Sequence, residues 1–384
     1  MFIPYGKQAI DAEDIQAVVE VLSSDWLTQG PAVERFEKAV AEYCEARFAV
    51  AVANGSAALH LAALAAGFGA GDEVVTTPLT FVASANCIAY CGASPVFADI
   101  DPESLCIDSA EVGRRLTSRT RGLIPVHFAG RVCDLPALAR IGRENGLTVI
   151  EDAAHALGAT YTAEGRTHRV GSCAHSDMTT FSFHPVKQIT TAEGGVITTN
   201  REDIYSRLLR LRTHGITRDP QQWRGRGGPW YYEMQQLGFN YRISDLHCAL
   251  GFTQLKKLER FLDRRRDIAE AYRQAFAGVE ELILPTRAAE SESAWHLFVL
   301  QFRSLDRGQV FDSLRDKGIG VNVHYIPVHL QPYYAEHFGC RKGDCPKAEA
   351  YYQRALTIPL FPAMTDMEVS LVIEAVLETI GGPE

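Results

Sequence analysis

The stretch FSFHPVKQITTAEGGVITTN, residues 181–200, places one lysine between two apolar runs. TTFSF (179–183) before it and GVITTN (195–200) after it are short runs rich in β-branched and aromatic residues, as in buried strands. Most lysines lie on the protein surface. Lys187 instead follows a buried strand, where a lysine amine can take part in chemistry.

Strands and helices alternate through the first half of the chain. Strands are predicted at 48–53, 73–77, 95–99, 122–127 and 147–152, and helices at 54–67, 80–91, 109–117 and 134–145. Continuous apolar strands separated by helices indicate a mostly parallel sheet that is covered on both faces. Such sheets bind ligands at the carboxyl ends of their strands.

The pattern changes after about residue 245. A long charged helix (244–277) is followed by HLFVLQF (296–302), GIGVNVHYI (318–326) and a closing helix near 367–380. This predicts a large α/β domain over 12–245 and a smaller α+β domain over 246–384, joined by residues 1–11. Upstream, Asp11 can cap a helix whose apolar stripe is Ile15, Val18, Val19 and Leu22.

Composition excludes several classes of protein. The net charge is −9, and the most basic patch, Arg264–Arg266, is balanced by Asp263 and Asp267. Neither nucleic-acid nor membrane binding is therefore expected. The chain shows no secretory signal and no apolar window long enough to span a membrane. Its nine scattered cysteines suit a reducing compartment, so a cytoplasmic enzyme is expected.

Three candidate features fall beside strand ends. Asn54-Gly55-Ser56 opens a helix, whose N–H groups can bind an anion, with Gly55 allowing close approach. Asp152 follows a second strand, and Ser182 and Lys187 follow a third. Each alone has an ordinary explanation, as a helix cap or a surface lysine. Together they fit pyridoxal phosphate, which needs a phosphate cradle, a carboxylate for its ring nitrogen and a lysine for its aldehyde.

Other cofactor patterns are absent from the sequence. GFGAG (67–71) is not GxGxxG and follows a helix, and there is neither a GxxxxGK[ST] nor an HExxH motif. His324 and His329 have Pro327 between them and cannot share a helix face, so no metal site is predicted.

Several motifs in order resemble the DegT/DnrJ/EryC1/StrS family of sugar aminotransferases. They are NGSAALHLA (54–62), TTPLTFVASANCIAYCGASPVFADID (76–101), VIEDAAHALGA (149–159), the opening stretch and GFNYRISDLHCALG (238–251). The resemblance implies a fold-type I, aspartate aminotransferase-like enzyme that uses pyridoxal phosphate and acts on nucleotide-linked keto sugars.

The resemblance also implies roles for single residues. Lys187 and Asp152 are the catalytic lysine and the partner of the ring nitrogen. The other cofactor-binding residues are Gly55, Ser56, Ala57, Phe81, Ala154, His155, Ser182 and, from the neighbouring subunit of a homodimer, Asn240. The substrate-contacting residues are Tyr5, Asp25, Trp26, Leu27, Thr28, His184, Arg242, Asn322, Val323, His324 and Tyr325. His155 stands where some relatives carry Gln. Arg212, His214 and Arg242 are candidate contacts for the diphosphate of the sugar nucleotide or the carboxylate of the donor, and for Arg212 the alternative is a solvated helix residue.

Within the family, SDWLTQGP (24–31) and HYIPVHLQPYY (324–334) favour the members that act in pseudaminic acid biosynthesis. The implied reaction moves an amino group from L-glutamate to the C4 keto group of a UDP-linked 4-keto-6-deoxy N-acetylhexose. Another nucleotide-sugar 3- or 4-aminotransferase is the alternative. A dehydratase of this fold would carry histidine in place of Lys187 or an iron–sulfur cluster, and a non-catalytic binding protein would be expected to lose Lys187 or Asp152.

Overall fold

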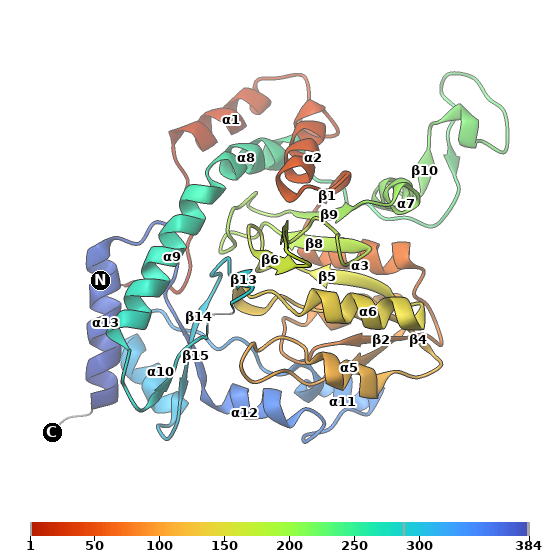
Figure 1. The fold of residues 1–384 in the computed structure, drawn as a ribbon. Coiled ribbons are helices and arrows are strands. Elements are labelled where there is room, and N and C mark those ends of the chain that lie inside the picture. The colour runs from red at the N-terminus through yellow and green to blue at the C-terminus, as the bar shows by residue number, and fades with distance from the viewer. Residues whose placement is uncertain (1, 287–288, 382–384) are drawn as a thin grey trace.

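A computed structural model describes residues 2–286 and 289–381, and its centre is a seven-stranded sheet (Figure 1). In order across the sheet, the strands are β1 (Phe48–Val52), β9 (Gly195–Thr199), β8 (Met178–Ser182), β5 (Thr148–Asp152), β4 (Thr120–Ile124), β2 (Glu73–Thr76) and β3 (Ser94–Phe97). Only β9 is antiparallel to its neighbours in this sheet. The predicted mostly parallel sheet is therefore confirmed.

Helices cover both faces of the sheet, as continuous apolar strands require. They are α3 (Gly55–Ala66), α4 (Ala83–Tyr90), α5 (Ser109–Arg115), α6 (Leu135–Asn145) and α7 (Glu202–Arg212). Adjacent residues of β5 point to opposite faces. Ile150 packs in one core with α3, α4 and α7, and Val149 packs in another with α5 and α6. Both faces of β5 are thus buried.

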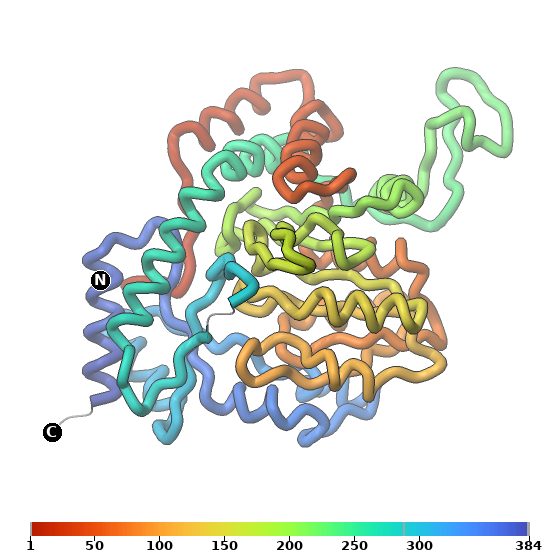
Figure 2. Tube along the Cα trace, in the orientation of Figure 1, coloured from red at the N-terminus to blue at the C-terminus, as the bar shows by residue number. Residues whose placement is uncertain are grey.

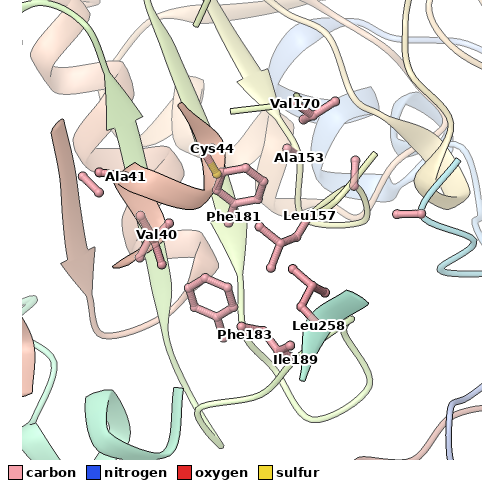
Figure 3. Packing of buried hydrophobic residues seen from close by; sticks show 14 of the residues in the cluster. Val40, Ala41, Cys44, Ala153, Leu157, Val170, Phe181, Phe183, Ile189 and Leu258 are labelled. Atoms are coloured by element: carbon pink, nitrogen blue, oxygen red, sulfur yellow. The ribbon is translucent and has the colours of Figure 1, made fainter. Parts of the chain in front are cut away.

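The segment that carries Lys187 is anchored on both sides by apolar packing. Phe183 and Ile189 flank it and are 0% and 1% exposed. Figure 3 shows their side chains beside those of Leu157 and Leu258 in one buried cluster. The backbone of Phe183 also accepts hydrogen bonds from the N–H of Thr191 and the hydroxyl of Thr190, both at 3.0 Å. The lysine therefore projects from a short, fixed loop.

Two N-terminal helices, α1 (Ala12–Leu22) and α2 (Pro31–Cys44), pack against α8 (Asp245–Lys256). Asp11 caps α1 as predicted. The apolar stripe of α1, however, faces outward: Ile15, Val19 and Leu22 are 59%, 45% and 58% exposed. Amphipathic periodicity identified the helix, but it did not show that the stripe would lack a partner within this chain.

The predicted helix 244–277 is two helices, α8 and α9 (Leu258–Ala275). The chain turns at Lys257, whose amine is buried against Asp11 and lies 3.0 Å from a carboxylate oxygen of Asp14. From this turn α9 runs alongside α13 (Asp366–Gly381), as Figure 2 shows. We keep the division into 12–245 and 246–384 as a proposal, and α8 is the element that links its two parts.

The C-terminal part contains a three-stranded sheet, β12 (Leu282–Ile283), β14 (Phe298–Phe302) and β15 (Ala355–Ile358). With it lie α10 (Arg307–Asp316), α11 (Pro332–Phe338) and α12 (Pro346–Arg354). HLFVLQF forms β14 as expected. GIGVNVHYI is not a strand, because it joins its neighbours through isolated bridges at Ile319 and Asn322. The bridge partner of Ile319 is Ile3, so the N-terminal segment packs here.

The remaining short elements lie at the edges of the molecule. They are the hairpin β6 (Thr160–Ala163) and β7 (Arg166–Arg169) with β13 (Ser291–Glu292), the pair β10 (Ile216–Thr217) and β11 (Glu233–Met234), and the 3₁₀ turns Phe128–Gly130, Pro220–Gln222 and Val328–Leu330. The segment between β10 and β11 projects away from the body (Figure 1). Within 2–286 and 289–381, no helix is long and apolar enough to cross a membrane.

A substitution at Gly195, the first residue of β9, can test how tightly β1, β8 and β9 are packed. A Cβ on Gly195 would lie 2.6 Å from the carbonyl oxygen of Asn54 and 2.9 Å from the nitrogen of Gly55. We expect Gly195→Ala to lower the free energy of unfolding by about 1–3 kcal/mol, because the backbone must move to admit the methyl group. Urea unfolding measures the change. Gly69→Ala is the matched control, since its Cβ would meet no atom within 4 Å, and an equal loss in both variants would contradict the packing argument.

Candidate active site

A cavity of about 680 Å³ opens at the carboxyl ends of the parallel strands. Residues that follow β1, β2, β4, β5 and β8 line it, and the segment 322–325 and Tyr5 close the opposite side. Cavities of this size hold small-molecule ligands. The topology therefore brings the candidate residues of the first half together, as the sequence predicted.

The start of α3 forms one end of the cavity. The side chain of Asn54 caps the helix by accepting a hydrogen bond from the Ala57 N–H at 2.8 Å. No described residue accepts a bond from the N–H groups of Gly55 or Ser56, which can therefore bind an anion. Ala57 does not line the cavity, because its N–H is used by the cap. At Gly55, a Cβ would lie 2.8 Å from that of Ser182, so glycine allows close approach of Ser182.

Asp152 is fixed in the floor of the cavity. It is 4% exposed, and its two carboxylate oxygens accept hydrogen bonds from the Ser84 hydroxyl at 2.6 Å and the Ala154 N–H at 3.1 Å. Ser84 is in turn 2.7 Å from the hydroxyl of Thr80. The carboxylate is held in one orientation and is suited to pair with a cationic ring nitrogen.

Lys187 lines the same cavity as Asp152. Burial lowers the pKa of its amine from 10.5 to about 8; the Asp152 carboxylate opposes this by favouring the charged form, and the Arg265 guanidinium lowers the pKa further. Near neutral pH, a substantial fraction of the amine is therefore neutral. Only the neutral amine is a nucleophile and a base.

Neutral histidines surround the lysine. Burial, the largest cause, lowers the pKa values of His155, His296 and His324. The Ala129 N–H donates to Nδ1 of His155 at 3.3 Å, so the proton of this ring is on Nε2, which donates to the Tyr325 oxygen at 3.2 Å. Burial raises the pKa of the Tyr325 phenol. Tyr325 thus remains protonated and can donate its own hydrogen into the cavity.

Most of the predicted site residues line this cavity. Besides those already described, it is lined by Phe81, Ala154, His184, Asn322, Val323 and His324. Phe81 is 58% exposed at its mouth. The sequence analysis missed Ser84, Thr80 and Arg265. Ser84 and Thr80 lie in the quoted motif 76–101, but nothing in their spacing indicates a bond to Asp152.

Another group of predicted residues lies outside the cavity. These are Asp25, Trp26, Leu27, Thr28, Asn240 and Arg242. All except Arg242 are exposed. Arg212 lies outside the cavity and is not a solvated helix residue, because it donates to the Glu37 carboxylate at 2.5 Å and to the Ala51 carbonyl at 2.8 Å. His214 is exposed and lies in the left-handed region, with φ 56°.

Comparison with known proteins identifies the family. The model of the DegT/DnrJ/EryC1/StrS aminotransferase family matches residues 8–377. This chain belongs to that family. It is 42% identical to the spore coat polysaccharide biosynthesis protein SpsC of Bacillus subtilis (strain 168), over 100% of this chain and 98% of SpsC.

Solved structures agree with this aminotransferase assignment. Helicobacter pylori PseC, an aminotransferase involved in the biosynthesis of pseudoaminic acid, superposes with a TM-score of 0.91 and 28% identity over 99% of this chain and 100% of PseC. S. venezuelae DesV superposes with a TM-score of 0.89 and 31% identity over 100% of both chains. Streptococcus pneumoniae Spr1654 has a structure in a PLP form, with a TM-score of 0.91 and 29% identity over 99% of both chains. The fold-type I architecture and a PLP-dependent sugar aminotransferase are thereby confirmed.

The pKa of Lys187 provides a test of the electrostatics of the cavity. We expect Asp152→Asn to lower the pKa of Lys187 below 8, because the carboxylate is the group that favours its charged form. The measurement is the pH dependence of Lys187 acetylation by acetic anhydride in cofactor-free protein, followed by peptide mass spectrometry. Asp312→Asn, on the exposed side of α10, should leave the midpoint unchanged. A higher midpoint in Asp152→Asn would contradict the assigned geometry.

Proposed function

We propose that this enzyme transfers an amino group from L-glutamate to the C4 keto group of a UDP-linked 4-keto-6-deoxy N-acetylhexose, in a pathway of the pseudaminic acid type. The observation that carries the proposal is that one cavity contains both Lys187 and Asp152. The substrate class is supported by the likeness to PseC and by the motifs at 24–31 and 324–334. A cytoplasmic enzyme is consistent with its nine free cysteines.

The residues present fit pyridoxal phosphate. The free N–H groups of Gly55 and Ser56, with the Ser182 hydroxyl nearby, would hold its phosphate. Asp152, fixed by its own hydrogen bonds, would pair with the ring nitrogen. Phe81, exposed at the cavity mouth, would cover one face of the ring. When bound, the cofactor supplies an aldehyde that carries the amino group and a cationic ring that accepts electrons.

Lys187 would then be the nucleophile and the proton carrier. With a pKa of about 8, roughly a quarter of its amine is neutral at pH 7.5, against about 0.1% for an unperturbed lysine. The neutral amine can take a proton from the donor carbon in the first half of the reaction, and its ammonium form can give a proton to the sugar carbon in the second half. Acid–base transfer by one positioned group contributes on the order of 100- to 10,000-fold to a rate.

The sugar would lie against the wall opposite the sheet. This wall contains Tyr5, Asn322, His324 and Tyr325, whose hydroxyl can donate a hydrogen bond into the same space. Their hydroxyl, amide and imidazole groups can bind the hydroxyl and acetamido groups of a sugar. The neutral state of the histidines suits an uncharged sugar ring.

We further propose a homodimer with shared active sites. Trp26 and Leu27 are 56% and 49% exposed and follow the outward stripe of α1. Trp230 and Leu237, in and after the projecting segment, are 79% and 75% exposed. These apolar side chains lack cover within the described residues, and Asn240 lies outside its own cavity. A second copy would cover these side chains and would bring its Asn240 to this cavity.

The proposed reaction is tested with a panel of nucleotide keto sugars. We expect 2-oxoglutarate release from glutamate, ping-pong kinetics and an amine at C4 of the preferred sugar, while Lys187→Ala shows no turnover because it lacks the proton carrier. Lys7→Ala, on the N-terminal segment outside the cavity, is the control. Transamination by Lys187→Ala at the wild-type rate, or an amine at C3, would contradict the proposal.

Shared sites predict complementation between two impaired variants. Lys187→Ala is inactive and Asn240→Ala is weakened, but a mixed dimer has one site with both native residues. Equal amounts, allowed to exchange subunits, should regain about a quarter of wild-type activity, since half the dimers are mixed and each has one native site. Activity no higher than the mean of the separate variants would show that Asn240 does not cross between subunits.

A further inference from the structure

Arg265 is a buried cation on α9. Its neighbours Arg264 and Arg266 have side chains that are 28% and 30% exposed and form ion pairs with Asp366 and Glu292. Arg265 is 1% exposed and points into the protein. From the sequence, these three arginines were expected to form one basic patch balanced by Asp263 and Asp267. For Arg265 that expectation is wrong, because its side chain is buried.

Four backbone carbonyls surround its guanidinium. Nη1 donates to Leu360 at 3.0 Å, to Trp295 at 3.2 Å and to His296 at 3.3 Å. Nη2 donates to the carbonyl of Lys187 at 3.4 Å. The guanidinium thus joins the lysine loop to two segments of the C-terminal part of the chain.

The positive charge has no counterion. No carboxylate in the described ranges forms an ion pair with Arg265, and its Nε has no hydrogen-bond partner there. Burial lowers its pKa to about 9, still well above neutral pH. An unpaired buried charge is costly, and groups of this kind are concentrated at functional sites.

We propose that Arg265 is a positioning residue for Lys187, because its guanidinium ties the backbone of the lysine to the carbonyls of Trp295, His296 and Leu360 and places a positive charge beside the amine. This inference rests on the proposed role of Lys187. Leu360, which accepts from Arg265, donates its own N–H to the carbonyl of Tyr5 at 3.2 Å. The ring of His296, a second acceptor, has its centroid 4.3 Å from that of His155, with the two ring planes tilted by 38°. One guanidinium therefore connects the lysine to residues on two sides of the cavity.

The charges on Arg265 and Asp152 have opposite effects on the pKa of Lys187. The ionisable groups around the lysine are Asp152 and His155 at and after the end of β5, His296 before β14, Arg265 on α9, and Tyr5, His184, Glu193, His324 and Tyr325 in the lining. The Asp152 carboxylate favours the ammonium form of Lys187, and the Arg265 guanidinium opposes it. Without Arg265, burial alone would oppose the effect of the carboxylate on the pKa of Lys187.

The test separates the charge of Arg265 from its hydrogen bonds. Arg265→Gln removes the charge and can still donate to a carbonyl, whereas Arg265→Lys keeps the charge and loses the forked donor. In cofactor-free protein, the midpoint of Lys187 acetylation should rise by about one pH unit in Arg265→Gln, so that the labelling rate at pH 7.5 falls roughly tenfold. In Arg265→Lys the midpoint should stay near that of the wild type, while kcat falls about tenfold or more with little change in KM, because the amine is misplaced.

Arg260→Met is the matched control, because Arg260 lies on the same helix with a side chain that is 70% exposed, and it should change neither quantity. An unchanged midpoint in folded Arg265→Gln, or a wild-type kcat in Arg265→Lys, would overturn the proposal. If Arg265→Gln does not fold, the kcat of Arg265→Lys alone decides it. Because acetylation needs no cofactor or turnover, a shifted midpoint in a protein without transaminase activity would reject the proposed function and retain the electrostatic effect.

Discussion

The active site depends on the balance of charge around one buried amine. In its proposed role as nucleophile and base, Lys187 must be neutral, yet Asp152 in the same cavity favours its ammonium form. Burial and the Arg265 guanidinium shift the balance the other way and bring the pKa to about 8. The surrounding structure maintains this balance: Phe183 and Ile189 anchor the lysine loop, and Ser84 fixes the carboxylate.

The sheet explains why these groups meet. In a parallel sheet the carboxyl ends of the strands lie at one edge, so residues from distant parts of the sequence converge without long loops. The end of β5 carries Asp152, the end of β8 leads to Lys187, and β1 leads into α3 with its free N–H groups. The one antiparallel strand, β9, begins at this edge and brings Gly195 against the backbone of Asn54. The topology of the sheet thus determines the positions of the free N–H groups at the start of α3, of the Asp152 carboxylate and of Lys187.

The outer surface supports the proposed homodimer. The stripe of α1, the exposed Trp26 and Leu27 and the projecting segment after β10 carry large apolar side chains without cover. Predicted substrate residues at 25–28 and the predicted phosphate ligand Asn240 lie outside the cavity of their own chain. These two observations have one explanation in a dimer, which would bury the apolar side chains and supply the missing contacts.

The sequence by itself determined the alternating architecture and the central residues of the site, because strand and helix periods and strand-end motifs are local signals. Lys187, Asp152, Ser56 and Ser182 could be placed at strand or helix ends without coordinates. Only the tertiary structure showed that α1 presents its stripe outward, since periodicity defines an apolar face but not what covers it. It also showed that Arg265 turns inward between two partly exposed arginines: successive helical residues point about 100° apart, and which of them faces the core depends on how α9 packs.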